Sequence, residues 1–314
     1  MAQQLMKGET WKDALKLVRG KARFTYPIYV EVKADEIRCR VLWLGSADVC
    51  PDSGAPVIRE RIEYRSFSEK PLYNMEHFDM YFLEFFKALP GCTELDIGIE
   101  VNGNFNDSYR WTQSSSGIPT EKLDKKTGKI SPALNVGMVK AIVFDLPESE
   151  HQFHARVHYI DQAAELLDEC GMKCSRPERH TAYNEAQVLA IYNTFREAGH
   201  EGAMGKTADH VYQRRRTFDW MKIKPSDTAD GKITGFNEAV SLEGVPLGRV
   251  GSINVRCEDG STSAPAGIPH ALGLELWLNQ EQYLGQWIEF QYMERDRAGG
   301  YRHPSYIRFR EDKQ

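Results

Sequence analysis

The run Tyr29-Val30-Glu31-Val32-Lys33-Ala34-Asp35-Glu36-Ile37-Arg38 decides the interpretation of this chain. Its first half is rich in β-branched and aromatic residues, which predicts a strand over about 27–33, and a second strand is predicted over about 38–44. Lys33 is therefore expected at a strand end or turn. A lysine amine placed in this way can act as a nucleophile if carboxylates and other cations are brought to it by the fold.

Charged clusters of the required kind follow Lys33 in a fixed order along the chain. Carboxylates can hold a metal ion, and lysines and arginines can stabilise the charge that develops on a phosphate. The clusters are Glu100, the pair Glu201 and Lys206, the segment Trp220-x-Lys222-x-Lys224, and the C-terminal Arg310-Glu311-Asp312-Lys313. Each cluster alone is weak, and their order and spacing together carry the prediction of attack on a phosphate.

Composition sets the broad class of the protein. The chain of 314 residues is 41% apolar and 27% charged, which suggests about two domains of an ordinary soluble protein. No secretory signal or stretch long enough to span a bilayer is visible, and the scattered cysteines suggest reduced thiols in the cytoplasm. The net charge of −5 means that contact with a polyanion would use local patches. The most basic patch holds Lys206, Arg214, Arg215, Arg216, Lys222 and Lys224.

Periodicity predicts a mixed α and β first domain. Helices are expected over 11–19, over about 74–88 with Asn74 as the N-cap, over 154–170, and from the Asn184 cap to Gly199. Strands are expected over 93–101 and 140–146, and a basic strand ends at Lys224. The stretch 103–135 shows no periodicity and is interpreted as a long loop, whose lysines (Lys122, Lys125, Lys126 and Lys129) suit either loose phosphate contact or a solvated tip.

A second, smaller domain is predicted at the C-terminal end. Pro225-Ser226-Asp227 resembles a linker, and strands are expected near 230–241, 247–256, 286–294 and 305–310, with one helix near 268–279. Several short strands in about 85 residues predict a small closed β-barrel.

The residues quoted above, taken together, resemble the sequence motifs of ATP-dependent DNA ligases of the small bacteriophage type. Seven partial matches in the right order are far more specific than any short motif alone. The matching segments are Lys33-x-Asp35-x-x-Arg38, Tyr64-Arg65-Ser66, Leu95 to Glu100, Ile142 to Asp145, Glu201 to Lys206, Trp220 to Pro225, and Arg302 to Lys313.

The resemblance implies a fold and an activity. It implies an α+β nucleotidyltransferase (adenylation) domain, ATP-grasp-like, of antiparallel sheets with flanking helices over 1–227, followed by an OB-fold β-barrel over 228–314. It implies an enzyme that seals nicks in double-stranded DNA, using ATP and Mg²⁺, through a covalent lysine–AMP intermediate and an adenylated 5′-phosphate. A monomer in the cytoplasm, that of the host if a phage encodes the chain, is the accompanying expectation, with no membrane partner.

The resemblance also assigns roles to individual residues. Lys33 would be the nucleophile, Lys222 and Lys224 would contact the α-phosphate, and Arg310, Asp312 and Lys313 would arrange the leaving pyrophosphate when the OB-fold domain closes. Asp35 and Glu201 would hold Mg²⁺. The nucleotide would be bound by Glu31 at the adenine edge, Phe144 by stacking, Arg38 and Glu100 at the ribose, and Lys206 and Trp220 in the pocket. Contacts with DNA would come from Arg65, Arg214, Arg215 and Arg216.

Two of these assignments have an ordinary alternative in the sequence. Phe144 lies in an apolar strand, where a core position is as compatible with the pattern as a stacking platform. The run Arg214-Arg215-Arg216 suits a solvated face as well as a path along a phosphate backbone.

Glu36 departs from the family pattern. The family's first motif has glycine directly after the aspartate, where glycine permits a sharp turn or close approach to a ligand. Glutamate at this place adds a side chain and a negative charge beside a polyphosphate. It could face solvent, bind metal or slow the first step.

Two other function classes remain open from the sequence. An RNA ligase or an mRNA-capping nucleotidyltransferase shares the motif order, and a nucleic-acid-binding module could have lost adenylation because of Glu36. The ending from Arg302 to Lys313 and a barrel directly after Pro225 favour the DNA ligases.

Overall fold

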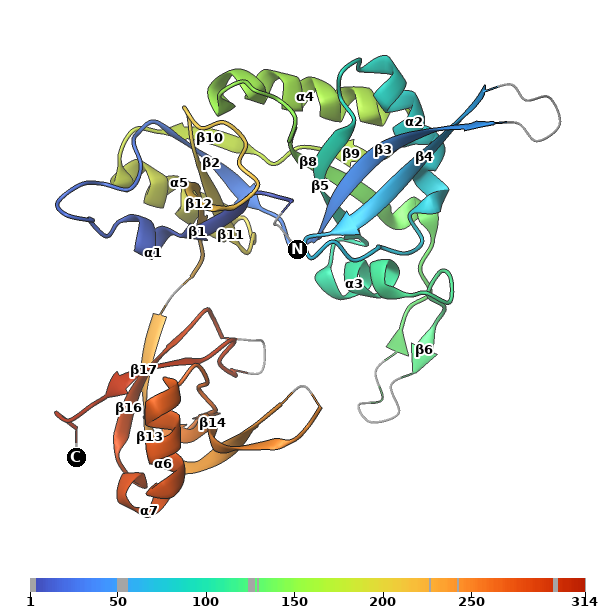
Figure 1. The fold of residues 1–314 in the computed structure, drawn as a ribbon. Coiled ribbons are helices and arrows are strands. Elements are labelled where there is room, and N and C mark those ends of the chain that lie inside the picture. The colour runs from blue at the N-terminus through green and yellow to red at the C-terminus, as the bar shows by residue number, and fades with distance from the viewer. Residues whose placement is uncertain are drawn as a thin grey trace. The chain divides into compact units, whose positions relative to one another are not determined.

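A computed structural model describes residues 4–49, 56–123, 128, 130–225, 227–241, 243–295 and 299–313, with residues 46–49 and 56–59 described by their backbone alone. The chain divides into two units, Met1–Ile223 and Lys224–Gln314. Figure 1 shows the chain from its blue N-terminal strands to the orange and red strands of the second unit. Lys125, Lys126, Lys129 and Ser226, which entered the sequence predictions, lie outside the described residues, as does Cys50, one of the scattered cysteines.

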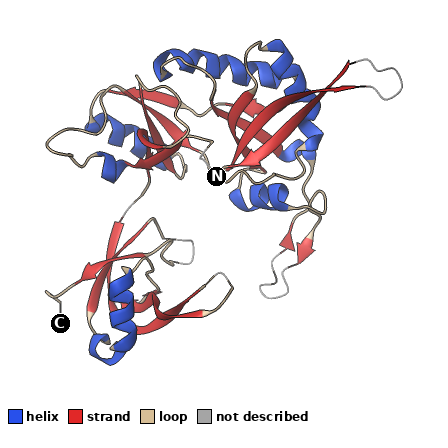
Figure 2. Ribbon diagram, in the orientation of Figure 1, coloured by secondary structure: helices blue, strands red, loops and turns tan. Residues whose placement is uncertain are grey.

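The first unit is built from two five-stranded sheets with helices packed on them (Figure 2). The first sheet has the order β1-β12-β11-β2-β10 and all its neighbours are antiparallel except β1 and β12. Its strands are β1 (Lys7–Thr10), β12 (Arg216–Ile223), β11 (Gly202–Thr207), β2 (Ile28–Lys33) and β10 (Arg179–Ala182).

Alternation along these strands gives the first sheet one apolar face. Side chains two residues apart share a face, so Ile28 and Val30 of β2 are buried together with Met221 and Ile223 of β12. Helices α1 (Trp11–Ala14) and α5 (Glu185–Glu197) supply the rest of this core. The Asn184 side chain accepts a hydrogen bond from the Gln187 amide, which confirms the predicted N-cap of α5.

The second sheet has the order β4-β3-β5-β8-β9, and its core is larger. Helices α2 (Asp79–Ala88) and α4 (Phe153–Glu169) cover its apolar face, in the upper right of Figure 1. Alternate residues of β5 point into this core, and Asp96, Gly98 and Glu100 therefore lie on the opposite face. The strands are β3 (Ile37–Val49), β4 (Pro56–Ser66), β5 (Glu94–Val101), β8 (Val139–Asp145) and β9 (Cys174–Ser175).

The prediction of one long loop over 103–135 is wrong in part, because residues 105–113 are helical. Helix α3 (Phe105–Gln113) begins at Asn104, whose side chain accepts from the Asp107 amide at 2.9 Å, and it buries Trp111 against the second sheet. A two-stranded hairpin follows α3. The apolar content of the stretch 103–135 is too low for periodicity to reveal these elements. The remaining short elements are β6 (Lys122–Leu123), β7 (Ile130–Ser131), η1 (Glu76–Phe78) and η2 (Val136–Met138).

Two helix predictions also need correction. The helix predicted over 11–19 ends at Ala14, since residues beyond it turn into a β-bridge between Val18 and Lys21. Asn74 does not cap α2. Its side chain is buried and donates to the carbonyl oxygens of Trp111 and Ser114, which ties the segment before α2 to the end of α3.

The second unit is a five-stranded antiparallel sheet of order β15-β14-β13-β16-β17. The predicted linker is shorter than expected, because β13 already begins at Asp227. Among the residues of this unit that the structure describes, no continuous ladder closes the predicted barrel. Its two edges meet at Ala266, which bridges Ser252 and Ser305, as expected of a partly open OB-fold. The elements are β13 (Asp227–Val240), β14 (Pro246–Cys257), β15 (Thr262–Ser263), α6 (His270–Leu278), α7 (Gln280–Tyr283), β16 (Trp287–Tyr292) and β17 (Ser305–Phe309).

None of the helices in the described part of the chain has the length and apolar character needed to cross a lipid bilayer.

Candidate functional site

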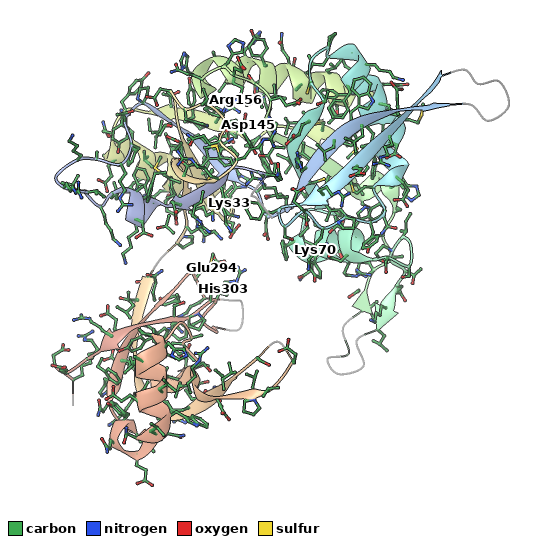
Figure 3. All side chains as sticks on the ribbon, viewed as in Figure 1. Lys33, Lys70, Asp145, Arg156, Glu294 and His303 are labelled. Carbon is green, nitrogen blue, oxygen red and sulfur yellow. The ribbon has the colours of Figure 1, made fainter. Side chains whose placement is uncertain are left out.

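Lys33 is the last residue of β2, where the chain leaves the first sheet for the second. Only Ala34, Asp35 and Glu36 separate it from β3, so its side chain lies at the junction of the two sheets (Figure 3). The amine donates to the Ala34 carbonyl oxygen at 3.3 Å and forms an ion pair with the Glu201 carboxylate, directly before β11. Both side chains are less than one-fifth exposed. The sequence prediction that Lys33 ends a strand is correct.

Strand register explains why the charged residues gather on one face of the first sheet. Glu31 and Lys33 lie opposite Met204 and Gly202 of β11, and Lys206 lies opposite Trp220 of β12. The alternate residues of each strand form the apolar core, so these side chains share the other face. Lys222 is on the same face of β12 as Trp220 by the same alternation.

A buried ion network forms the floor of the site. The Lys206 amine lies 2.8 Å from one Glu31 oxygen and donates to the Phe144 carbonyl oxygen at 3.0 Å. Arg179 donates to the other Glu31 oxygen at 2.7 Å and to Asp161 at 3.1 Å. Burial lowers the pKa of Lys206, and the neighbouring carboxylate of Glu31 opposes that change. The network therefore fixes β2, β11 and β8 relative to one another.

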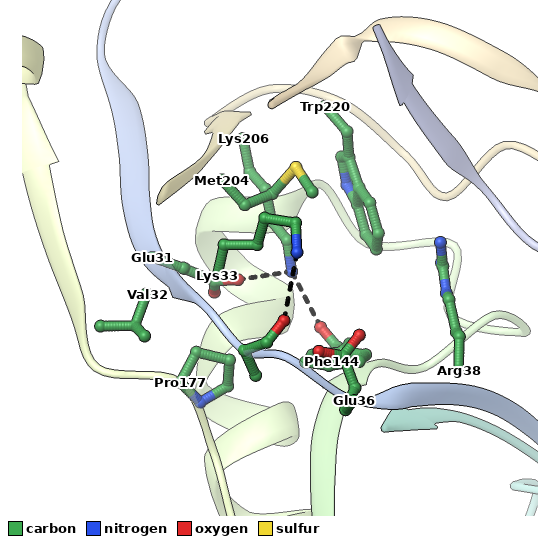
Figure 4. A pocket seen from close by; sticks show the side chains of 11 residues that line it. Glu31, Val32, Lys33, Glu36, Arg38, Phe144, Pro177, Met204, Lys206 and Trp220 are labelled. Atoms are coloured by element: carbon green, nitrogen blue, oxygen red, sulfur yellow. Dashed lines mark hydrogen bonds and ion pairs between the residues drawn. The ribbon is translucent and has the colours of Figure 1, made fainter. Parts of the chain in front are cut away.

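A pocket of about 420 Å³, its open mouth included, lies above this floor between the facing sides of the two sheets (Figure 4). Its wall combines apolar surface with a few charged groups, as is common in small-molecule sites. Residues from both sheets and from the chain before β10 line it: Glu31, Val32, Lys33, Ala34, Glu36, Arg38, Phe144, Pro177, Met204, Lys206 and Trp220.

Arg38 is held rigidly at the edge of the pocket. Its guanidinium makes two hydrogen bonds to Asp96, at 2.8 and 2.5 Å, and lies 4.9 Å from the Trp220 ring centre. Asp96 is fully buried and also accepts from the Tyr212 hydroxyl at 2.7 Å. The Tyr212 hydroxyl in turn accepts from the Met6 amide at 2.9 Å, so the N-terminal segment helps to fix Arg38.

Glu36 contributes a carboxylate to the pocket wall. Its side chain packs against Gly98 of β5, and a Cβ atom at residue 98 would overlap the Glu36 Cγ and lie 2.8 Å from the Phe144 ring. One Glu36 carboxylate oxygen is buried and has no hydrogen-bond partner among the residues that the structure describes. Burial raises the pKa of Glu36 to about 7, although Lys33 and Arg38 oppose the rise.

A second buried ion pair supports the site from behind. Asp145, which directly follows Phe144, pairs with Arg156 of α4 at 2.5 Å, and both side chains are fully buried (Figure 3). The Arg156 guanidinium also lies 3.2 Å from His210 Nε2, which accepts a hydrogen bond from the Trp220 indole at 3.1 Å. Burial lowers the pKa of His210 to about 4, so its ring is neutral near pH 7 and accepts from Trp220.

The structure brings together many but not all of the residues named from the sequence. Glu31, Lys33, Arg38, Phe144, Lys206 and Trp220 line one pocket, with Glu201 bound to Lys33. Phe144 is thus a wall residue and not a core residue. Glu100 lies on the correct face of β5 but is not part of the pocket lining, and Asp35 is exposed. Lys224 is the first residue of the second unit.

The C-terminal candidates form their own cluster in the second unit. Arg310 binds Asp230 at 2.8 Å and Asp312 at 2.7 Å, while Lys313 binds Asp230 at 2.6 Å and Glu258 at 2.5 Å. Asp230 of β13 therefore neutralises two cations and orders the end of the chain.

The arginines predicted to contact DNA are each engaged with a neighbour in the first unit. Arg65 binds Glu63 at 2.6 Å, Arg215 binds Gln213 at 2.7 Å, and Arg216 binds Glu9 at 3.3 Å. Arg214 is tied to Glu94 at 2.7 Å and to the Gln4 carbonyl oxygen at 2.8 Å. Their role in DNA binding stays a prediction.

The carboxylates near Lys33 suit a metal ion whose coordination shell is completed by a bound ligand. No group of three or more His, Cys, Asp or Glu side chains arranged to hold a metal ion occurs within the described ranges. Mg²⁺ commonly takes one or two protein carboxylates, with waters and substrate phosphates as its other ligands. Glu201, beside the Lys33 amine, fits that pattern.

Sequence reasoning missed several residues that build the site. Asp96 lies within a quoted motif, but nothing in its spacing indicated a pair with Arg38. Arg179 and Tyr212 come from segments without a motif, and only the folded chain brings them to Glu31 and Asp96. Glu36 stood out as a departure from the family pattern, which was the one available signal for its position in the pocket wall.

Comparison with known proteins gives a consistent likeness. No protein-family model matches the sequence. The DNA ligase of Enterobacteria phage T3 is 32% identical over 141 residues, which cover 42% of this chain and 40% of that enzyme. The DNA ligase of Escherichia phage T7 is 28% identical over 160 residues, covering 42% of this chain and 44% of the T7 enzyme. In these alignments the chain thus spans less than half of its relatives' length.

Solved structures extend the likeness to nearly the whole chain. A Lig E DNA ligase structure matches 99% of this chain and all of its own, with a TM-score of 0.62 and 16% identity. The ATP-dependent DNA ligase of bacteriophage T7 in complex with ATP matches 98% of this chain and 99% of its own, with a TM-score of 0.54 and 19% identity. At these identities the match establishes a shared fold, which confirms the predicted α+β architecture.

Proposed function

We propose that this protein is an ATP-dependent DNA ligase that seals nicks in duplex DNA through a lysine–AMP intermediate. One observation carries the proposal: the Lys33 amine is paired with the Glu201 carboxylate at a pocket between two sheets, and an arginine and an aromatic ring line the same pocket. The sequence likeness to the T3 and T7 DNA ligases supports the choice of reaction. The nucleotidyltransferase domain would be 1–227 and the OB-fold domain 228–314.

The first step joins the enzyme to the nucleotide. The Lys33 amine loses a proton, because only the free amine carries a lone pair, and attacks the α-phosphorus of ATP. A nitrogen–phosphorus bond forms, and the bond from that phosphorus to the bridging oxygen of the β-phosphate breaks, releasing pyrophosphate. Glu201 orients the amine before attack, and the cations Lys222 and Lys224 would stabilise the charge on the phosphate oxygens.

The rest of the pocket would hold the nucleotide. Phe144 offers a ring for stacking, Glu31 lines the same pocket, and Arg38 is fixed at the edge by Asp96. Mg²⁺, held by Glu201 and Asp35 together with phosphate oxygens, would neutralise phosphate charge. Arg310, Asp312 and Lys313 would act on the pyrophosphate.

Two further transfers complete the reaction. An oxygen of the 5′-phosphate at the nick attacks the AMP phosphorus, and the bond to Lys33 breaks. The 3′-hydroxyl then attacks the 5′-phosphorus, which forms the phosphodiester bond and releases AMP. Arg65, Arg214, Arg215 and Arg216 are the proposed contacts to the duplex, each of which would make binding depend on salt. The proposed enzyme is a monomer in the cytoplasm, that of the host cell if the gene is carried by a phage.

Intact-mass measurement after incubation with ATP and Mg²⁺ tests the first step. The wild-type protein is expected to gain the mass of one AMP, and Lys33→Arg is expected to gain none because guanidinium does not deprotonate. Lys16→Arg is the matched control, since Lys16 is an exposed lysine paired with Asp13. A protein without the adduct, but still bound to nucleic acid, would point to a binding module.

Substrate comparison separates the remaining alternatives. Sealing of a nicked DNA duplex, with no sealing of nicked RNA, supports a DNA ligase over an RNA ligase. An adduct formed from GTP in preference to ATP would instead indicate a capping-type nucleotidyltransferase.

A further inference from the structure

Glu36 and Gly98 are complementary neighbours on adjacent strands. Glu36 directly precedes β3, and Gly98 is on β5, where it pairs with Arg38. The Glu36 side chain fills the space that a side chain at residue 98 would need, since a Cβ there would overlap the Glu36 Cγ. The glutamate can therefore enter the pocket wall only because its neighbour has no side chain.

The Glu36 carboxylate is available to a ligand. It lines the pocket, and in Figure 4 it points toward the pocket interior beside Phe144. One of its oxygens is buried without a partner among the side chains and backbone groups that the structure describes. A carboxylate only accepts hydrogen bonds when ionised, and an unpaired buried acceptor is costly. For the ionised form of Glu36, the missing partner is therefore a hydrogen-bond donor.

Position identifies which donor of a nucleotide is in reach. Glu36 lines the same pocket as Phe144, with which it shares the contact at Gly98, and as Lys33, three residues earlier in the chain. If the base stacks on Phe144 and the α-phosphate meets Lys33, the part of the nucleotide between them is the ribose. The exocyclic amine of adenine is on the far side of the base from the sugar, and thus away from Glu36.

The other carboxylates of the region are less suited to the sugar. Each Glu31 oxygen is already bound by a cation, Lys206 or Arg179, and Asp96 is saturated by Arg38 and Tyr212. Glu100, the residue that the family resemblance assigns to the ribose, is not part of the pocket lining.

We infer that Glu36 is the ribose-recognising residue of this pocket, accepting a hydrogen bond from a sugar hydroxyl and thereby selecting ribonucleotides over deoxyribonucleotides. The inference rests on the proposed adenylation function. It assigns the ribose of the nucleotide to Glu36, the residue that departs from the family pattern. The same charge keeps phosphate oxygens away from this wall and leaves them to the cations near Lys33.

A comparison of ATP, 2′-deoxy-ATP and 3′-deoxy-ATP tests the inference. Rates of adduct formation give kcat/KM for each nucleotide in the wild type and in Glu36→Gln, which keeps the shape but removes the charge. Hydrogen bonds to charged groups are worth enough to predict a wild-type preference for ATP over at least one deoxy analogue of on the order of 10- to 100-fold. Glu36→Gln should reduce this preference to a few-fold.

A reciprocal exchange keeps the test independent of simple loss of folding. Gly98→Glu alone should impair nucleotide use, because its side chain competes for space with Glu36. The double variant Glu36→Gly with Gly98→Glu supplies a carboxylate to the same space from the neighbouring strand once the Phe144 ring, 2.8 Å from the added Cβ, shifts to admit it. It should recover the preference for ATP that Glu36→Gly alone loses.

The outcomes separate this inference from the proposed function. If the adduct forms with the same preference for ATP over its deoxy analogues in the wild type and in Glu36→Gln, the role of Glu36 is overturned and the ligase proposal stands. If no adduct forms, calorimetric binding of ATP and its deoxy analogues decides the matter. A preference for ATP that depends on Glu36 then supports the inference although adenylation fails, and equal binding overturns it.

Discussion

Removal of Arg156 should reveal how strongly the site depends on its buried support. Arg156 and Asp145 are both fully buried, and the guanidinium makes contacts to Asp145 at 2.5 and 3.1 Å and to the His151 carbonyl oxygen. Arg156→Met keeps the apolar stem but leaves the Asp145 carboxylate buried without its cation. Breaking a buried pair in this way costs about 3–5 kcal/mol of the free energy of unfolding.

An exposed ion pair in the same unit provides the matched control. Arg176 lies 3.2 Å from Asp161, with its side chain 44% exposed, so Arg176→Met should cost only about 0–1 kcal/mol. Urea denaturation gives both values from the midpoint and slope. The double variant Asp145→Asn with Arg156→Met should recover most of the loss, since neither charge of this pair remains and asparagine can still accept from the Leu146 amide.

The comparison has a clear refuting result. If Arg156→Met and Arg176→Met differ by less than about 1 kcal/mol at equal slope, the Asp145 carboxylate is not isolated by burial as the structure indicates. An equal loss in the double variant would show that the other contacts of the guanidinium, to the His151 carbonyl oxygen and to His210, account for the loss, and not the isolated charge of Asp145.

Three smaller predictions follow from local geometry. His210→Gln should flatten the pH dependence of the free energy of unfolding. The pKa of His210 is about 4 in the folded protein and about 6.5 in the unfolded chain, so between these pH values only the unfolded chain binds the proton. The wild type therefore loses up to ~3 kcal/mol of its free energy of unfolding as the pH falls from 6.5 through 4. Gly171→Ala should cost more than Gly199→Ala in urea denaturation. Both have positive φ, costing about 1–2 kcal/mol, but only Gly171 has a neighbour, Tyr81, 2.9 Å from the added Cβ. Asn184→Ala should lower the thermal midpoint through loss of about 1 kcal/mol from the α5 cap.

Local patterns were sufficient for most of the elements. The strand ending at Lys33, the helix capped by Asn184 and the strands of the second unit follow from alternation, capping and turn residues, which act over a few neighbouring positions. The same local reasoning failed for α3, because a single buried Trp111 anchors it and little apolar periodicity surrounds that residue. It also failed at Asn74, whose amide is used by a distant segment.

The sequence by itself determined which chemical groups this protein has and in what order, since Lys33, Glu201 and Lys222 can be read directly from the motifs. Only the tertiary structure decided which of them meet. Strands β2 and β3 are adjacent in the chain but belong to different sheets, so the pocket forms where the chain crosses between them. The contact of Glu36 with Gly98 depends on pairing between strands about 60 residues apart, which local preferences do not specify.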